Sequence, residues 1–254
     1  MNITGFFEYI KNLIYPGGEE KTPADLKRAL RYLISKSLGR NFDAAAIKAA
    51  AEDIYSLHDR VSFEEMSHIA DLYCRIASSD ETLARRYANS CRRVYLSAGF
   101  EFLKKSGVLC AQFSKRSYNS DEAEEVSGAM DDISAIRGAD DAAKTKALDF
   151  AGALSTRGNH SEAMDALIMT PETVASFLKY GDSAMVCSIF DFFIHTALKR
   201  PGAAVPIYKH SALLLEIFGH AKMIEFARIC VLESRGEAKK IEEMIKKFTE
   251  EFAE

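Results

Sequence analysis

Apolar residues in this chain recur with the three-to-four-residue spacing of amphipathic helices, and glycines separate one such stretch from the next. From residue 138 onward a glycine follows roughly every twenty residues, at Gly138, Gly158, Gly181, Gly202, Gly219 and Gly236. Each interval matches the period of a helix with one buried face. No stretch alternates apolar and polar residues between hairpin turns, which is the pattern of a half-buried strand. The sequence therefore predicts an all-α protein.

Capping residues place the helix boundaries. Ser62 and Glu65 have the spacing of a capping box, and Thr22-Pro23 and Thr170-Pro171 have the N-cap and N1 residues of helix starts. Gly99 interrupts one apolar run, and Gly158 and Gly219 lie where a helix C-terminus is expected. The predicted helices are 3–15, 22–38, 43–58, 62–77, 78–98, 100–116, 140–157, 161–168, 171–180, 183–199, 204–218, 221–235 and 237–252, and the one from Ser78 starts at a second capping box with Glu81.

Helices of this length joined by short turns pack as antiparallel neighbours. One helix pair for roughly every 40 residues is typical of helical-hairpin arrangements. We therefore expect antiparallel helical hairpins that form either a short α-solenoid or a compact multi-helix bundle.

Residues 147–171 carry a family resemblance. Ala147-Leu148-Asp149-Phe150-Ala151 is followed by Gly158-Asn159-His160-Ser161-Glu162-Ala163, which resembles the core of the tetratricopeptide repeat. The resemblance implies that Gly158 ends the first helix of a hairpin and that Ala163 allows the second helix to approach closely. It covers one hairpin and lacks the tryptophan and other large marker residues of that family, so it indicates the broad class of helical repeats.

Residues 117–143 differ from the rest of the chain because they are rich in Asp and Glu and poor in apolar residues. Such a segment is either a surface helix or an acidic connector, and it is the best candidate for a domain boundary. We predict an N-terminal helical part over 1–116 and a C-terminal hairpin part over 144–254, with one continuous domain as the alternative.

Composition narrows the classes of function. The 254 residues are 48% hydrophobic, so we expect a folded protein, and the net charge of −4 does not favour binding to nucleic acid or to an anionic membrane surface. The five cysteines are far apart, which favours reduced, buried thiols and a cytoplasmic location. No run is long and apolar enough for a transmembrane helix. The helix over 3–15 has one Lys, and we expect it to dock on protein rather than lipid.

The clearest charged group is an arginine stripe, which we define as Arg85, Arg86, Arg92 and Arg93. At 100° per residue, the two members of each seven-residue pair lie about 20° apart, so all four share one helix face. Guanidinium groups in that arrangement suit recognition of carboxylates or phosphates. The stripe is our candidate partner-binding site. The alternatives are a solvated face or an internal partner for the acidic segment.

A second pattern is Glu65-x-x-His68, which has the spacing used by di-iron carboxylate bundles. Such a site needs a second pair of the same kind, and the chain has none. Surface Glu and His residues are the simpler interpretation, and we expect no metal and no cofactor.

The sequence also lacks phosphate-binding loops, nucleophile elbows and zinc-protease motifs. We therefore predict a non-enzymatic interaction or scaffold module that binds a protein or peptide partner. The alternatives are a metal-dependent helical-bundle enzyme using Glu65 and His68, and a phosphate or nucleic-acid binder using the arginine stripe.

Overall fold

The computed structural model describes residues 49–252, except 51, 55, 58, 116–119 and 157–159. The helices predicted over 3–15 and 22–38, and most of the one over 43–58, lie outside these residues. The described part contains no strand, so the all-α prediction is confirmed there. Its helices are α4 (Phe63–Ala77), α5 (Glu81–Phe113), α6 (Ser120–Ser134), α7 (Asp141–Thr156), α8 (His160–Phe177), α9 (Ser183–Lys199), α10 (Pro201–Glu233) and α11 (Ala238–Phe252).

Side-chain caps fix several helix starts. At α4, the Ser62 side chain accepts a hydrogen bond from the backbone of Glu65, and the Glu65 carboxylate accepts one from the backbone of Ser62, at 2.7 Å. The predicted capping box is therefore present. Asp80 and Asp182 cap α5 and α9 in the same way, each accepting a backbone N–H three residues later. These bonds satisfy N–H groups that have no partner inside a helix.

Single glycines divide the two longest helices. Gly99 in α5 and Gly219 in α10 have nearly the same conformation, with φ of 74° and 70° and an extended ψ. Residues other than glycine rarely adopt this positive φ, which explains why both positions are occupied by glycine. Each glycine ends one straight helix and starts another, so α5 consists of 81–98 and 100–113, and α10 of 201–218 and 220–233. The interruptions expected at Gly99 and Gly219 are confirmed.

The prediction of separate helices over 161–168 and 171–180 is wrong. The structure has one helix, α8, with Pro171 inside it. Proline removes the backbone donor for the carbonyl four residues earlier. Next to this gap, the Thr170 hydroxyl donates to the Ala166 carbonyl at 2.7 Å, and Thr173 donates to Met169. The Thr-Pro pair is therefore part of a continuous helix with side-chain bonds to its backbone, and does not start a new one.

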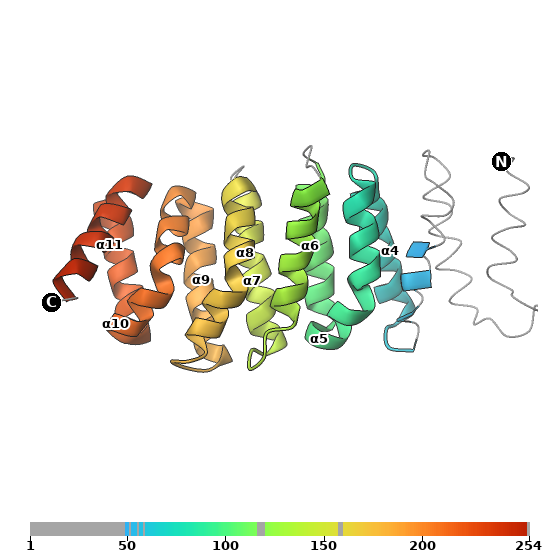
Figure 1. Cartoon of the computed structure of the whole chain (residues 1–254), viewed down its shortest axis with the longest axis horizontal. Coiled ribbons are helices and arrows are strands. Elements are labelled where there is room, and N and C mark those ends of the chain that lie inside the picture. Colours follow the sequence, from blue (N-terminus) through green and yellow to red (C-terminus); the bar gives the residue numbers. More distant parts are fainter. Residues whose placement is uncertain are drawn as a thin grey trace, which may run out of the picture.

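The helices stand in a row of pairs, with α4 at one end and α11 at the other (Figure 1). We call the two rows of helices layers. The first layer contains α4, residues 100–113, α7, α9 and residues 220–233, and lies behind in Figure 1. The second layer contains residues 81–98, α6, α8, residues 201–218 and α11, and lies in front. Each described helix contacts its partner in a pair and its neighbours along the row.

The core lies between the two layers and is densely aromatic in the C-terminal half. Phe150, Phe190, Phe193 and Tyr208 come from α7, α9 and α10, and their ring centroids lie between 4.8 and 6.4 Å apart. The hydroxyl of Tyr208 is hydrogen-bonded to that of Thr170 at 2.8 Å, which satisfies a polar group inside the core. Burial raises the pKa of Tyr208 to about 12. The predicted apolar faces therefore meet in one shared core.

The acidic segment forms a helix of the second layer. Ala123, Val126, Met130 and Ile133 of α6 are buried at helical spacing, and α6 contacts α5 on one side and α8 on the other. One cluster of buried side chains extends from Ala50 to Ile245. Of the two structures that the sequence left open for this segment, the described residues form the surface helix.

Candidate functional site

Two neighbouring cavities hollow the outer face of the first layer, on either side of α9. The first, about 760 Å³, lies between α9 and residues 220–233 of α10. The second, about 530 Å³, lies over residues 100–113 of α5, α7 and α9. Asp191 lines both cavities, so together they form one groove across four consecutive helices of that layer. This groove is the candidate functional site.

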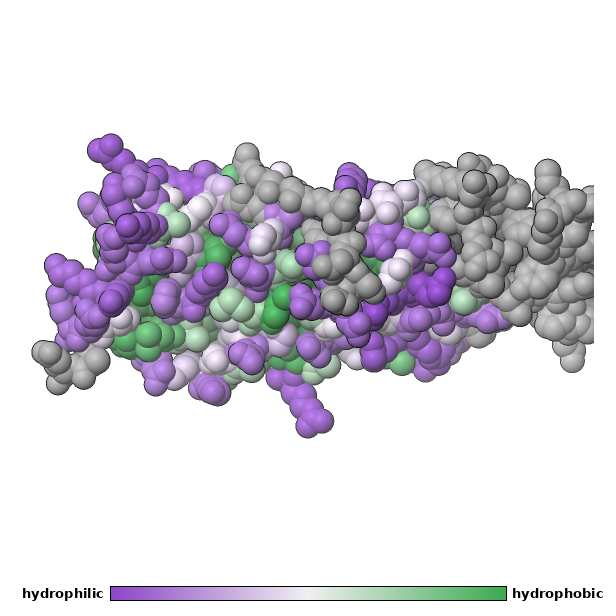
Figure 2. All heavy atoms as spheres, turned by 45° about the horizontal axis from the view of Figure 1, so that its top comes forward, coloured by the Kyte–Doolittle hydropathy of each residue, from purple (hydrophilic) through white to green (hydrophobic). Residues whose placement is uncertain are grey.

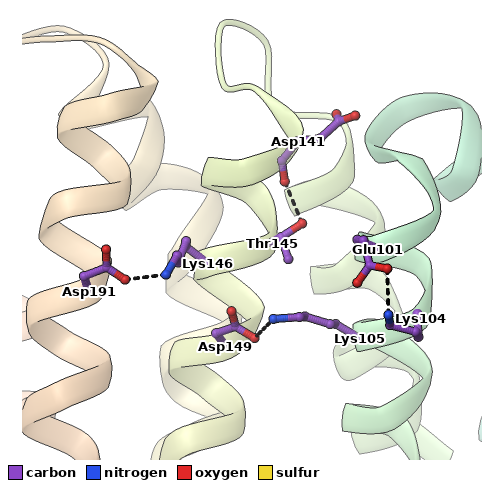
Figure 3. A network of polar contacts seen from close by, with 8 residues as sticks. All are labelled: Glu101, Lys104, Lys105, Asp141, Thr145, Lys146, Asp149 and Asp191. Atoms are coloured by element: carbon purple, nitrogen blue, oxygen red, sulfur yellow. Dashed lines mark hydrogen bonds and ion pairs between the residues drawn. The ribbon is translucent and has the colours of Figure 1, made fainter.

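The part of the groove over α5 and α7 is crossed by a ladder of ion pairs, which Figure 3 shows from close by. Lys105 of α5 pairs with Asp149 of α7, and Lys146 of α7 pairs with Asp191 of α9. Its hydrogen bond to Asp191 raises the pKa of Lys146. Lys104 pairs with Glu101 within α5, at 2.6 Å. The charges at this end of the groove are therefore largely compensated inside the chain.

The part of the groove between α9 and α10 has a different charge balance. Lys199, Arg200 and Arg228 line it, and Asp191 is its one acidic lining residue. That carboxylate already pairs with Lys146. Between the basic groups lie the apolar side chains of Phe192, Ile224, Val231 and Leu232. This end of the groove therefore combines an apolar floor with a basic rim.

One polar atom in the wall of the groove has no partner. Gln112 lines the cavity over α5 and α7, and its Oε1 is buried without a hydrogen-bond donor among the described residues. A buried acceptor without a donor carries a desolvation cost. A backbone N–H of a bound segment would satisfy it.

The arginine stripe lies on the second layer, away from the groove. Arg86 pairs with Glu124 at 3.0 Å and Arg93 pairs with Asp131, so two of the four guanidinium groups face the acidic helix α6. Arg85 pairs with Glu81 on its own helix, and Arg92 donates to the carbonyl of Ser56. The internal partner in the acidic segment, one of the alternatives above, is therefore found for Arg86 and Arg93. A partner-binding role for the stripe stays a prediction.

The Glu65-x-x-His68 pattern forms no cluster of ligands. Glu65 is engaged in the capping box of α4, and His68 is exposed on the same helix. In the described ranges no three His, Cys, Asp or Glu side chains lie close enough together to hold a metal ion. Both residues therefore lie on the surface of α4, where Glu65 stabilises the start of the helix.

None of the five cysteines forms a disulfide bond in the described part of the chain, and four of the five are buried. Burial raises the pKa of Cys110 to about 12 and that of Cys230 to about 11, which keeps both thiols protonated and unreactive at neutral pH. Cys187 is partly exposed, so the expectation of buried thiols holds for the other four. A raised pKa also disfavours thiolate formation at Cys187.

The groove could not be predicted from the sequence. Its lining residues come from helices that are far apart in the sequence. The paired residues Lys105 and Asp149 are 44 positions apart, and Lys146 and Asp191 are 45 positions apart. Within one helix each of these residues has the pattern of an ordinary solvent-facing position. A weak signal was present, because Lys146 and Asp149 stand one turn apart on the outer face of one predicted helix.

None of the helices in the described ranges has both the length and the apolar composition to cross a membrane. Comparisons with family models, with curated proteins and with solved structures found no significant similarity to this chain.

Proposed function

We propose that this chain is a non-enzymatic interaction module that binds a protein or peptide partner in the groove of the first layer. The observation that carries the proposal is the pair of adjoining cavities, about 760 and 530 Å³, along one face of stacked helices. Cavities of this size are typical of ligand sites in proteins. Stacked helices offer long surfaces of this kind for binding extended partners.

Exposed apolar side chains support the same face. Leu198 and Leu232 line the groove and are 42% and 65% exposed. A partner that covers them removes apolar surface from water, which is the main favourable term in most protein association. Figure 2 views the molecule from the top and from the side of the second layer, and there too apolar side chains reach the surface among hydrophilic ones.

Two pairs of substitutions test the proposal. Leu198→Glu with Leu232→Glu places carboxylates in the groove, whereas Leu96→Glu with Leu213→Glu makes the same change at leucines of the second layer that are 57% and 43% exposed. Proteins captured from lysate of the source cells are quantified by mass spectrometry for the wild type and for both variants. We expect a set of partners that the groove variant loses and the control variant retains. Equal capture by all three proteins contradicts the proposal.

A further inference from the structure

We propose that the cavity between α9 and α10 binds an acidic segment of a partner protein, with one bulky apolar side chain of that segment seated on the cavity floor. This inference rests on the proposed function and adds the chemistry of the partner.

The first argument is the local charge. Lys199 and Arg228 line the cavity, are exposed, and take part in no ion pair or hydrogen bond among the described residues. Arg200 donates one guanidinium N–H to the carbonyl of Val231 at 2.7 Å, a neutral acceptor that leaves its positive charge uncompensated. Asp191 is occupied by Lys146. Three positive charges therefore surround the cavity without a carboxylate of their own.

The second argument is that this charge is local and does not reflect the composition of the chain. The whole chain has a net charge of −4. The groove over α5 and α7 pairs its lysines with carboxylates, as Lys105 does with Asp149. On α10 the nearby Glu225 and Glu233 do not line the cavity. A positive site on a negative protein favours an acidic partner through charge complementarity, and it raises the rate of encounter.

The third argument is the shape and polarity of the cavity. Lys199 and Arg200 stand at the end of α9, and Arg228 stands across the cavity on α10. Phe192, Ile224 and Leu232 line the same cavity with apolar surface. A carboxylate would contact only the basic residues, whereas an aromatic or large aliphatic side chain would cover the apolar residues. A segment in which acidic residues flank one such side chain uses both.

The arginine groups also match the chemistry of a carboxylate. A guanidinium group presents a planar fork of N–H donors that two carboxylate oxygens can accept together. Among the described residues no group accepts a hydrogen bond from Arg228, and Arg200 donates to Val231. Asp and Glu side chains of the segment are therefore the groups that these donors fit.

The test uses a short fluorescently labelled peptide in which Asp and Glu residues flank a single Phe on both sides. Two control peptides replace every acidic residue by Lys, or the Phe by Ala. Binding to the full chain is measured by fluorescence anisotropy at about 0.05 and about 0.3 M salt, because screening weakens attraction between exposed charges. The protein variants are Lys199→Glu with Arg228→Glu, and Leu232→Ala. The matched control is Lys222→Glu with Lys239→Glu, two exposed lysines outside the cavity with the same change of charge.

We expect the acidic Phe peptide to bind wild-type protein, with weaker binding at the higher salt concentration. Reversal at Lys199 and Arg228 should reduce the affinity by about tenfold or more, and the matched control by less than about twofold. Leu232→Ala and the peptide without Phe should each bind more weakly. Circular dichroism confirms that every variant remains folded.

Several outcomes overturn the inference. If the peptide without Phe binds as tightly as the peptide with Phe, the protein only attracts polyanions in general. The same holds if the cavity variant and the Lys222→Glu, Lys239→Glu control lose equal affinity. A single-stranded oligonucleotide that displaces the peptide with the same dependence on Lys199 and Arg228 identifies a nucleic-acid site instead. Sedimentation that shows self-association, abolished by the same reversal, identifies a second copy of the chain as the occupant.

The inference and the proposed function can fail separately. If the groove variant with Leu198→Glu and Leu232→Glu loses partners but the acidic peptide does not bind, the groove binds a partner of other chemistry and only the inference is wrong. If partner capture is unchanged as well, the proposed function is also wrong.

Discussion

Small residues determine how closely the two layers approach. Gly107 is buried in α5, and a methyl group placed on it would lie 2.6 Å from the Tyr87 hydroxyl and 2.8 Å from Leu72. Tyr87 has little room to move, because it is buried and donates a hydrogen bond to the Leu103 carbonyl. This contact between helices explains why a glycine stands inside a helix at position 107.

Gly107→Ala should therefore lower the free energy of unfolding by about 1–3 kcal/mol through overpacking. Gly128→Ala is the matched control, because Gly128 lies in α6 with no atom within 4 Å of the added methyl group. It should raise stability by about 0.5–1 kcal/mol, since alanine favours the helix. Urea denaturation measures both. A stabilised Gly107→Ala variant would show that the two helices can separate at little cost.

Residue-scale features of another kind could be predicted from the sequence. Gly99 and Gly219 interrupt apolar runs, and both take the positive φ that only glycine adopts readily. Ala163 is fully buried, and the close helix contact that the repeat resemblance implies for it stays a prediction. The sequence could not predict which side chain hydrogen-bonds to the backbone where the helix ends before Gly99. The buried Lys144 donates to the carbonyl of Ser97, a group left free where the helix ends, from 47 positions further along the chain.

At the scale of elements, α6 shows that one acidic sequence pattern is compatible with two structures, a connector and a surface helix. Its acidic residues suggested a boundary, yet its buried face packs between α5 and α8. Two ion pairs join α6 to α5, and both span the same number of positions, 38. This equal separation means that the two helices run parallel and in register, with Arg86 and Arg93 matched to Glu124 and Asp131.

Charge reversal tests that register. Arg86→Glu with Arg93→Glu places like charges opposite α6, and we expect faster amide exchange in α6. The loss in global stability should be small, because exposed ion pairs are worth about 0–1 kcal/mol each. Adding Glu124→Lys and Asp131→Lys to this variant should restore pairs of opposite charge and slow amide exchange in α6 again. Arg85→Glu is the control, because Arg85 pairs within its own helix. Unchanged exchange of α6 in the first variant would mean that the pairs do not hold it in place.

The helix start at Ser62 was predictable from its capping box, whereas the start predicted at Ser78 was wrong, because Asp80 caps α5 and Ser78 ends α4. The prediction failed at Pro171 because proline at the first position of a helix and proline inside a helix look alike in sequence. What distinguishes the two here is tertiary. Thr170 next to Pro171 bonds to Tyr208 of α10, and Val174 beyond it is buried in the same core. Packing of both halves on one neighbour keeps the helix continuous.

At the scale of the whole molecule, the candidate site is a property of the row and not of any single helix. The lining combines exposed residues such as Arg228 with buried ones such as Leu148, and the groove exists only where neighbouring helices of the first layer meet. The sequence predicts the helices and their pairing in hairpins. It does not predict which outer faces adjoin, because that depends on the stacking angle between pairs.

The row also predicts how the molecule unfolds. α11 packs mainly on α10, so among the described helices the C-terminal end of the row is supported from one side. In such an arrangement stability is close to a sum of terms between neighbours, and a defect acts locally. Ile241→Ala in α11, a fully buried side chain, should lower local stability by about 2–5 kcal/mol.

Hydrogen exchange read by mass spectrometry should then show loss of protection in α10 and α11, with α4 and α5 unchanged. Leu72→Ala, a buried leucine of α4, is the mirrored control and should affect α4 and α5 while sparing α11. A uniform loss of protection in all described helices would show that they unfold as one cooperative unit. The local outcome also bears on the candidate site, because its basic cavity lies between α9 and α10. Ile241→Ala should therefore weaken partner binding from outside the groove, whereas Leu72→Ala should not.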